Sequence, residues 1–224
     1  MARVPKKKQI IDRKALVGAL EDLVGWSGYT SKTQGQVLAI FKSYMTNGFA
    51  EVRRRFEEDS ISGNEVLRSN SFLIDQLVIN IHYFAIQYVY PMSNPTTGEQ
   101  ISVAATGGYG REEMAPHSDI DLLFLLPYKK TAHSEQVIEF ILYMLWDMGL
   151  KVGHATRSVD ESIRLARQDL TICTSLLESR WLLGGEQLYR DFKQRFADEV
   201  VAKDQLGFTD AKLEERDKRH ASMG

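Results

Sequence analysis

Apolar residues in the first ninety positions recur at spacings of three and four, which is the period of an amphipathic helix. This pattern predicts helices over residues 12–24, 31–58 and 65–88. Asp12 can cap the first of them, and Gly25 follows its last apolar residue. We therefore expect a helical N-terminal region over residues 1–92, ending in a loop at 91–98 that contains two prolines.

The pattern changes after this loop, where short apolar runs replace the helical spacing. Strands are expected over residues 101–105, 119–126 and 151–157. A brief helix is expected over 111–114, because Pro116 disfavours helical backbone just before it. A longer helix is expected over 135–148, capped by Ser134 and ended by Gly149.

Helical spacing returns from residue 160, with an interruption near Gly184-Gly185 and a last helix over 186–201. A charged tail over 209–220 is expected to be helical or loose. The predicted fold class is α+β, with a small mixed β-sheet flanked by N-terminal and C-terminal helices. The sheet core and a helical extension that follows it are expected over residues 99–158 and 159–224.

Charge and cysteine content narrow the function classes. The formal net charge of −2 gives no broad positive field, so nucleic acid is not favoured as the main partner. No apolar run approaches the roughly 20 residues that span a bilayer, so no membrane partner is expected. Cys173 is the single cysteine, which excludes an intrachain disulfide, fits a cytoplasmic location and predicts a small core residue.

Two carboxylates carry the candidate chemistry. Asp119 and Asp121 are two residues apart at the start of an apolar strand, so both project from the same face, while Ile120 faces away. Like charges roughly 6–7 Å apart along a strand repel each other. Magnesium would relieve this repulsion, because it takes oxygen ligands and is usually held by one or two carboxylates plus substrate phosphates. We therefore predict that both residues are catalytic and bind Mg²⁺.

A glycine-rich segment just before these acids supplies the other half of the motif. Gly107, Gly108 and Gly110 carry no side chains, so the backbone can approach a ligand closely and point its N–H groups at phosphate oxygens. Arg111 could reach a phosphate with its planar guanidinium, and Ser118 could donate one more hydrogen bond. These five residues are the predicted nucleotide-binding set.

Each half of the motif is ambiguous when it is taken alone. Glycine clusters usually mark tight turns, and an Asp-x-Asp pair is often a solvated strand edge or a cap. Together, with a β-rich run before the glycines and an apolar strand after the acids, they favour nucleotidyl transfer. The implied reaction is attack on an α-phosphorus with pyrophosphate leaving, without a covalent protein nucleophile.

The string Gly-Gly-Tyr-Gly-Arg-x-Glu-Met-Ala-Pro-x-Ser-Asp-Ile-Asp-Leu-Leu-Phe-Leu resembles the DNA-polymerase-β-like nucleotidyltransferase superfamily. Within it, the string is similar to the bifunctional uridylyltransferase/uridylyl-removing enzymes that act on the PII nitrogen-signalling protein. The resemblance continues over residues 149–157 and 169–185. It implies transfer of UMP from UTP to a tyrosine of PII with release of pyrophosphate. It also implies that Gly107 and Gly108 contact the triphosphate and that Asp119 and Asp121 bind magnesium.

The chain departs from that family in two respects. Family members are several times longer, with a His-Asp phosphohydrolase domain and two ACT domains, and no His-Asp dipeptide occurs here. We therefore expect an N-terminal fragment without uridylyl removal or direct glutamine sensing. The superfamily also commonly has a third carboxylate on a later strand, but residues 151–157 hold His154 and no acid. His154 could be a core histidine or a contact to substrate phosphate.

Four acids remain candidates for the third carboxylate, and the sequence does not choose among them or exclude that there is none. They are Asp160, Glu161, Asp169 and Glu178. Asp169 could equally be a helix cap, and Glu178 could pair with Arg180 or Arg157. Two other functions stay open: a nucleotide- or PII-binding module without turnover, and a nucleotidyltransferase with a different nucleotide or acceptor.

Overall fold

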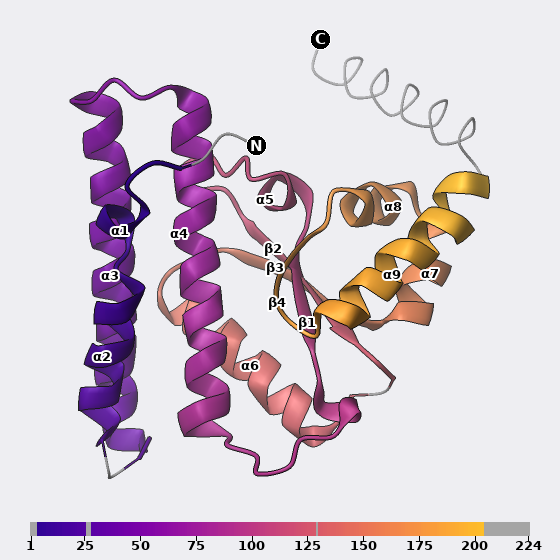
Figure 1. Ribbon diagram of the computed structural model, residues 1–224, viewed down its shortest axis with the longest axis horizontal. Helices are drawn as coiled ribbons and strands as arrows, with labels where there is room; N and C mark the ends of the chain where they lie inside the picture. Colours follow the sequence, from indigo (N-terminus) through magenta and orange to yellow (C-terminus); the bar gives the residue numbers. More distant parts are fainter. Residues whose placement is uncertain (1–3, 26–27, 129, 204–224) are drawn as a thin grey trace.

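The computed structural model describes residues 4–25, 28–128 and 130–203, which form a mixed sheet between two groups of helices (Figure 1). The four-stranded sheet has the order β3-β2-β1-β4. Its strands are β1 (Ser102–Ala105), β2 (Ile120–Leu126), β3 (Val152–Ser158) and β4 (Arg180–Gly184). Strand β1 pairs antiparallel with β2 and β4, whereas β3 pairs parallel with β2. The predicted α+β class with a mixed sheet is confirmed.

Four described helices form the N-terminal region, and side chains accept hydrogen bonds from the free N–H groups at the start of two of them. They are α1 (Lys7–Ile10), α2 (Arg13–Val24), α3 (Ser31–Glu57) and α4 (Gly63–Phe84). The Asp12 carboxylate accepts from the first turn of α2, as the sequence predicts. Ser62 and Glu65 cap α4 reciprocally, which fixes its start two residues before the predicted one. The three predicted helices are confirmed.

Helix α4 continues into a π-helical turn, η2 (Ala85–Val89). By length and composition, Gly63–Val89 could cross a membrane, although the sequence alone showed no apolar run of that length. Its apolar side chains pack inside the protein: Leu77, Ile81 and Phe84 are fully buried. In Figure 1 this helix stands between α3 and the sheet, which is the position of a core helix.

The second half of the chain contributes helices on both faces of the sheet. They are α5 (Gly107–Gly110), α6 (Ala132–Asp147), α7 (Val159–Ala166), α8 (Leu170–Leu177) and α9 (Glu186–Glu199), with 3₁₀ turns η3 (Thr97–Glu99) and η4 (Val201–Lys203). Helix α6 lies on the side of α4, and α7 to α9 lie on the other side of the sheet (Figure 1).

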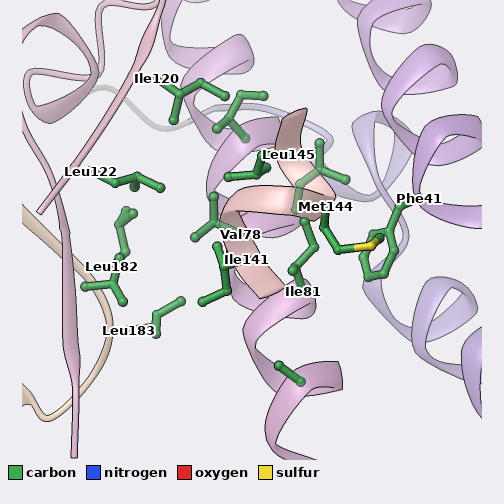
Figure 2. Close-up of a cluster of buried hydrophobic side chains, with 14 of the residues drawn as sticks. Phe41, Val78, Ile81, Ile120, Leu122, Ile141, Met144, Leu145, Leu182 and Leu183 are labelled. Carbon is green, nitrogen blue, oxygen red and sulfur yellow. The ribbon is translucent and has the colours of Figure 1, made fainter. Parts of the chain in front are cut away.

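Side chains that alternate along β2 divide the core into two clusters. Ile120, Leu122 and Phe124 pack with α4 and α6, as the close-up in Figure 2 shows for the first two. Leu123 and Leu125 pack with the C-terminal helices, where Phe192 and Phe196 are also buried. Cys173 is buried in this second cluster, as predicted for a core residue. Because Asp121 alternates with Ile120, its carboxylate lies on the second face.

Three local predictions are wrong. The brief helix is α5, formed by the glycines themselves, and Arg111 is its C-cap. Thr131 rather than Ser134 caps α6, with Ser134 as the other half of the capping box. Residues 180–184, expected to be helical up to the break at 184–185, form the edge strand β4. The charged tail over 209–220 lies outside the described residues.

Candidate nucleotide-transfer site

The paired carboxylates lie where β2 enters the sheet. Asp119 directly precedes the strand and is exposed, whereas Asp121 is its second residue and is half-buried. The backbone N–H of Thr106 donates to the carbonyl of Asp121 at 3.0 Å, which ties the segment before α5 to this strand. Burial and the neighbouring Asp119 carboxylate raise the pKa of Asp121.

Two glycines leave room around the Asp121 carboxylate. Gly153 is opposite Asp121 in the parallel β2–β3 pair, and a Cβ atom placed on it would be 2.5 Å from Asp121 Oδ1. Gly107 has a φ of +57°, and a Cβ atom there would be 3.3 Å from Asp121 Oδ2. Both carboxylate oxygens therefore face backbone without side chains, which gives a cation or a phosphate access to them.

The two carboxylates fit a magnesium ion whose remaining ligands come from the bound substrate and from water. Asp119 and Asp121 would provide oxygen ligands at the start of the strand. Within the described residues, no group of three or more His, Cys, Asp or Glu side chains is arranged to hold a metal ion. A hard cation held by two carboxylates would complete its shell with water and phosphate oxygens, as magnesium usually does.

A pocket of about 460 Å³ opens beside Asp121, which is the member of the carboxylate pair in its lining. Its floor comes from β2 and β3, one end from the α5 turn, and one wall from α8. The lining residues are Thr106, Gly107, Asp121, Leu122, Leu123, Gly153, His154, Ala155, Arg157, Thr171, Ile172, Thr174, Ser175, Leu176 and Glu178. One end of the pocket is therefore acidic and glycine-lined, and its walls carry apolar groups and hydroxyls.

The predicted nucleotide-binding residues divide into two groups. Gly107 lines the pocket, and Gly108 follows it in α5. Gly110 is buried, and a Cβ there would be 2.2 Å from the carbonyl oxygen of Glu178, so the structure requires a glycine for packing. Arg111 forms ion pairs with Glu113 at 2.8 Å and Glu178 at 2.7 Å.

Ser118 is exposed and lines a smaller cavity of about 140 Å³ instead of the large pocket. This cavity also includes Phe49, Asn70 and Lys151. The backbone N–H of Ser118 donates to the carbonyl of Ala115 at 3.1 Å, which closes the turn that leads into Asp119. The nucleotide contacts of all five residues, Gly107, Gly108, Gly110, Arg111 and Ser118, stay predictions.

Comparison with known proteins agrees with this geometry. Residues 95–178 match the family described as nucleotidyltransferase domain, a range that includes β1, β2, β3 and every residue that lines the pocket. The chain carries a nucleotidyltransferase domain. Over 222 residues, 99% of the chain, it is 51% identical to a bifunctional uridylyltransferase/uridylyl-removing enzyme of Rhodospirillum rubrum. Enzymes with the same description from Azospirillum brasilense and Novosphingobium aromaticivorans are 48% and 44% identical.

The chain spans 24% of the length of each of these relatives. Sequence identity of 44–51% across essentially the whole chain covers the N-terminal helices as well as the matched domain. The resemblance stated from the sequence is therefore confirmed: a nucleotidyltransferase domain matches residues 95–178, and the whole chain is similar to the N-terminal quarter or so of uridylyltransferase/uridylyl-removing enzymes.

Sequence reasoning missed the side chains that hold the α5 turn of the nucleotidyltransferase domain. Arg180 on β4 binds Asp75 on α4 through two hydrogen bonds of 2.8 and 3.0 Å. The same guanidinium donates to the carbonyls of Tyr109 and Gly110, each at 3.3 Å. Burial raises the pKa of Asp75 despite this partner. Helix α4, β4 and the glycine turn are thus fastened by one arginine, and no local pattern links residues 105 positions apart.

The four candidate third carboxylates occupy different places. Asp160 pairs with Arg195 on α9, and Glu161 is exposed on α7. Asp169 accepts from the N–H groups of Thr171 and Ile172 at 2.7 and 3.0 Å, which is a helix cap. Glu178 lines the pocket but pairs with Arg111, not with Arg180 or Arg157. Glu178 is the one of the four that reaches the site.

The β3 residues of the nucleotidyltransferase site also differ from the expectation. His154 pairs with Leu122, and its ring lies 6.0 Å from that of Trp146 on α6, which is the other face of the sheet from Asp121. Gly153 and Arg157 are on the Asp121 face, because paired residues of parallel strands project to the same side. Side chains alternate between the two faces along a strand, and this period of two would have predicted that Arg157 and His154 lie on opposite faces.

Proposed function

We propose that this nucleotidyltransferase transfers UMP from UTP to a tyrosine hydroxyl of the PII protein, with magnesium, and releases pyrophosphate. One observation carries the proposal: the Asp121 carboxylate lines a pocket of nucleotide size, two residues after the exposed Asp119, and Gly107 and Gly153 leave space around it. The choice of UMP follows the uridylyltransferase names of the relatives. The choice of PII follows the resemblance of the glycine and aspartate motif.

In this proposal the aspartates supply the charge that binds the cation, and the glycines position the phosphates. Ionised Asp119 and Asp121 would hold the cation, and their closeness makes binding it favourable, because both carry negative charge beside each other. The bound magnesium would neutralise charge on the phosphates and on the leaving pyrophosphate. Backbone at Gly107 and Gly108 would lie against the phosphates without a side chain between them.

The acceptor hydroxyl would attack the α-phosphorus from the open side of the site. Asp121 lines the pocket beside α8 and is half-buried, whereas Asp119 just before it is exposed, so the rim of the site at Asp119 is accessible from solvent. A tyrosine on a projecting segment of a second protein can reach such a rim. The bond from the α-phosphorus to the pyrophosphate oxygen breaks as the bond to the tyrosine oxygen forms. No covalent protein intermediate is required.

Transfer of label tests the proposal. The protein is incubated with PII, MgCl₂ and UTP or ATP labelled at the α-phosphate, and PII is then isolated. We expect label from UTP to reach PII and label from ATP to stay in solution. Binding of UTP without labelling of PII would favour the binding-module alternative. Labelling from ATP would assign a different nucleotide.

Substitution of the carboxylates tests the assigned site. Asp119→Asn and Asp121→Asn are each expected to abolish magnesium-dependent transfer, because the amides cannot supply the negative charge that holds the cation. Asp191→Asn is the matched control, since Asp191 is an exposed acid on α9 whose partner is Gln187. Wild-type transfer rates in both site variants would overturn the mechanism.

A further inference from the structure

The pocket has two ends that differ in chemistry. Gly107, Asp121 and Glu178 stand at one end, next to the α5 turn. From there, β3 runs along the floor from Gly153 to Arg157, and α8 runs back along the wall from its C-terminal end to Thr171. Arg157 and Thr171 therefore stand at the end far from the carboxylates.

Both elements give a similar length for the pocket. Gly153 and Arg157 are four residues apart on a strand, which is about 13 Å at ~3.3 Å per residue. Thr171 and Glu178 are seven residues apart along α8 and its cap, which is about 10 Å at 1.5 Å per residue. The strand thus places Arg157 about a nucleotide's length from the site where the α-phosphate would react, and the helix gives a similar span between Glu178 and Thr171.

Arg157 is the cation of this pocket whose hydrogen-bonding groups are available. It is opposite Leu125 in the β2–β3 pair, on the Asp121 face, and it is half-buried. Among the described residues its guanidinium makes no hydrogen bond or ion pair. Arg111, the arginine that the sequence favoured, is held by Glu113 and Glu178. A planar group with five N–H donors therefore faces the far end of the pocket.

The far end suits a nucleobase better than a triphosphate. Ile172 beside Thr171 and Ala155 on the floor line the pocket with apolar surface, which a flat ring can cover. The first N–H groups of α8 are already taken by Asp169, whose negative charge opposes a phosphate there. The triphosphate then belongs at the glycine end, and the base belongs beside Arg157.

We propose that Arg157, with the hydroxyls of Thr171 and Ser175, selects a base whose edge carries carbonyl oxygens, such as uracil. The inference rests on the proposed function, because it takes the nucleotide to react at Asp121. Guanidinium groups donate and never accept, so they match the carbonyl oxygens of uracil. Cytosine and adenine carry an amino group on the corresponding edge, and a donor would then face a donor.

Equilibrium binding with magnesium tests the base preference without requiring transfer. UTP, CTP and ATP are titrated into the wild type, Arg157→Gln and Arg157→Lys. We expect the wild type to bind UTP more tightly than CTP, and Arg157→Gln to lose at least about tenfold of that ratio, because a charge-assisted hydrogen bond is removed. Arg157→Lys keeps the charge without the planar fork and should fall between them. Arg164→Gln, an exposed arginine on α7 that bonds Gln168, is the control.

The outcomes separate this inference from the function on which it rests. Equal weakening of all three nucleotides by Arg157→Gln would overturn it and assign the guanidinium to phosphate binding or to structure. An unchanged UTP-to-CTP ratio, or a wild type without base preference, would overturn it as well. A wild type that binds no nucleotide with magnesium would overturn the proposed function too. Melting curves verify folding, and Arg157→Lys keeps the test decisive if Arg157→Gln unfolds.

Discussion

The two faces of the sheet are covered in different ways, although they share the same strands. The N-terminal face is packed against the long helix α4 and against α6, and the β2 residues Ile120, Leu122 and Phe124 are all buried there. The other face is covered by α7, α8 and α9, which meet Leu123 and Leu125. That cover stops before the start of β2, where Asp121 is half-buried.

The difference shows where a site can form in a small α+β domain. A face that is covered along its whole strand leaves no room for a ligand, because interiors pack to crystal-like density. The C-terminal face leaves one end of the sheet uncovered, and the pocket lies between this end and α8. The N-terminal face thus contributes only to stability. The C-terminal face contributes to stability through buried residues such as Phe192, and it also leaves the Asp121 carboxylate accessible.

The same glycine-to-alanine change on each face should have opposite consequences. Gly153→Ala puts a Cβ 2.5 Å from Asp121 Oδ1, so the carboxylate must move. A displacement of about 1 Å at a reacting group can cost about a hundredfold in rate, and we expect a loss of that size in nucleotidyl transfer. The melting temperature should change little, because the carboxylate can turn toward solvent. Rates are measured with labelled UTP.

Gly48→Ala is the counterpart on the N-terminal side. Its Cβ would be 2.6 Å from a Leu73 methyl group and 2.9 Å from the carbonyl of Ile10. Overpacking should lower the free energy of unfolding by about 1–2 kcal/mol and leave the rate per folded molecule unchanged. Gly35→Ala, with nothing within 4 Å, controls for helix propensity. Loss of transfer in Gly48→Ala, or full transfer in Gly153→Ala, would contradict the division between the faces.

Arg180 joins the two faces, and its removal should be the largest single loss of stability. Arg180→Ala leaves the Asp75 carboxylate, with 16% of its side chain exposed, without its partner. We expect a loss of about 3 kcal/mol in the free energy of unfolding, measured by urea denaturation. Transfer should also slow, because the carbonyls of Tyr109 and Gly110 lose their donor.

The exposed pair Arg190–Glu186 is the matched control for this prediction. Both side chains are more than half exposed, and Arg190→Ala should change the free energy of unfolding by less than about 1 kcal/mol. If Arg180→Ala costs no more than Arg190→Ala, the Asp75–Arg180 pair does not fasten α4 to the sheet. A double variant, Asp75→Asn with Arg180→Ala, should recover part of the loss, since no unpaired charge remains.

A pH dependence should follow from the packed face. Burial and the neighbouring His133 lower the pKa of His82, on α4, to about 4, below the ordinary value of about 6.5. The unfolded chain therefore binds the proton more readily. Stability from this group is complete above pH 6.5 and decreases as the pH falls toward 4. Melting temperatures from pH 7 to pH 4.5 should fall less steeply in His82→Gln than in the wild type. Parallel slopes would show that His82 is not responsible.

The sequence predicted the packed face better than the open one, and the reason is physical. Helices such as α3 and α4 repeat their apolar period over many turns, so local spacing determines them. Strand β4 has five residues, and its partner β1 begins about 75 residues earlier, so only tertiary pairing makes it a strand.

The part of the candidate site that depends on local sequence spacing could be predicted. Asp119 and Asp121 could be placed on one face of a strand from a period of two. Arg157 could not be placed in the pocket, because its role depends on the parallel pairing of β3 with β2 and on α8. Arg111 was assigned to phosphate from its position next to the glycines, but ion pairs with two acids could not be read from spacing.

Asp169 gives the smallest effect and decides between two roles for an acid beside the site. As the cap of α8, its carboxylate accepts from Thr171 and Ile172. Asp169→Ala should therefore lower the free energy of unfolding by about 1 kcal/mol, and Asp169→Ser should restore most of it, because serine also caps. A magnesium ligand would behave differently: both variants would weaken magnesium-dependent UTP binding, and serine would not rescue it. We expect UTP binding at saturating magnesium to stay within about twofold in both. A tenfold loss shared by alanine and serine would instead make Asp169 the third carboxylate, and the wall formed by α8 would then belong to the metal site as well as to the nucleotide pocket.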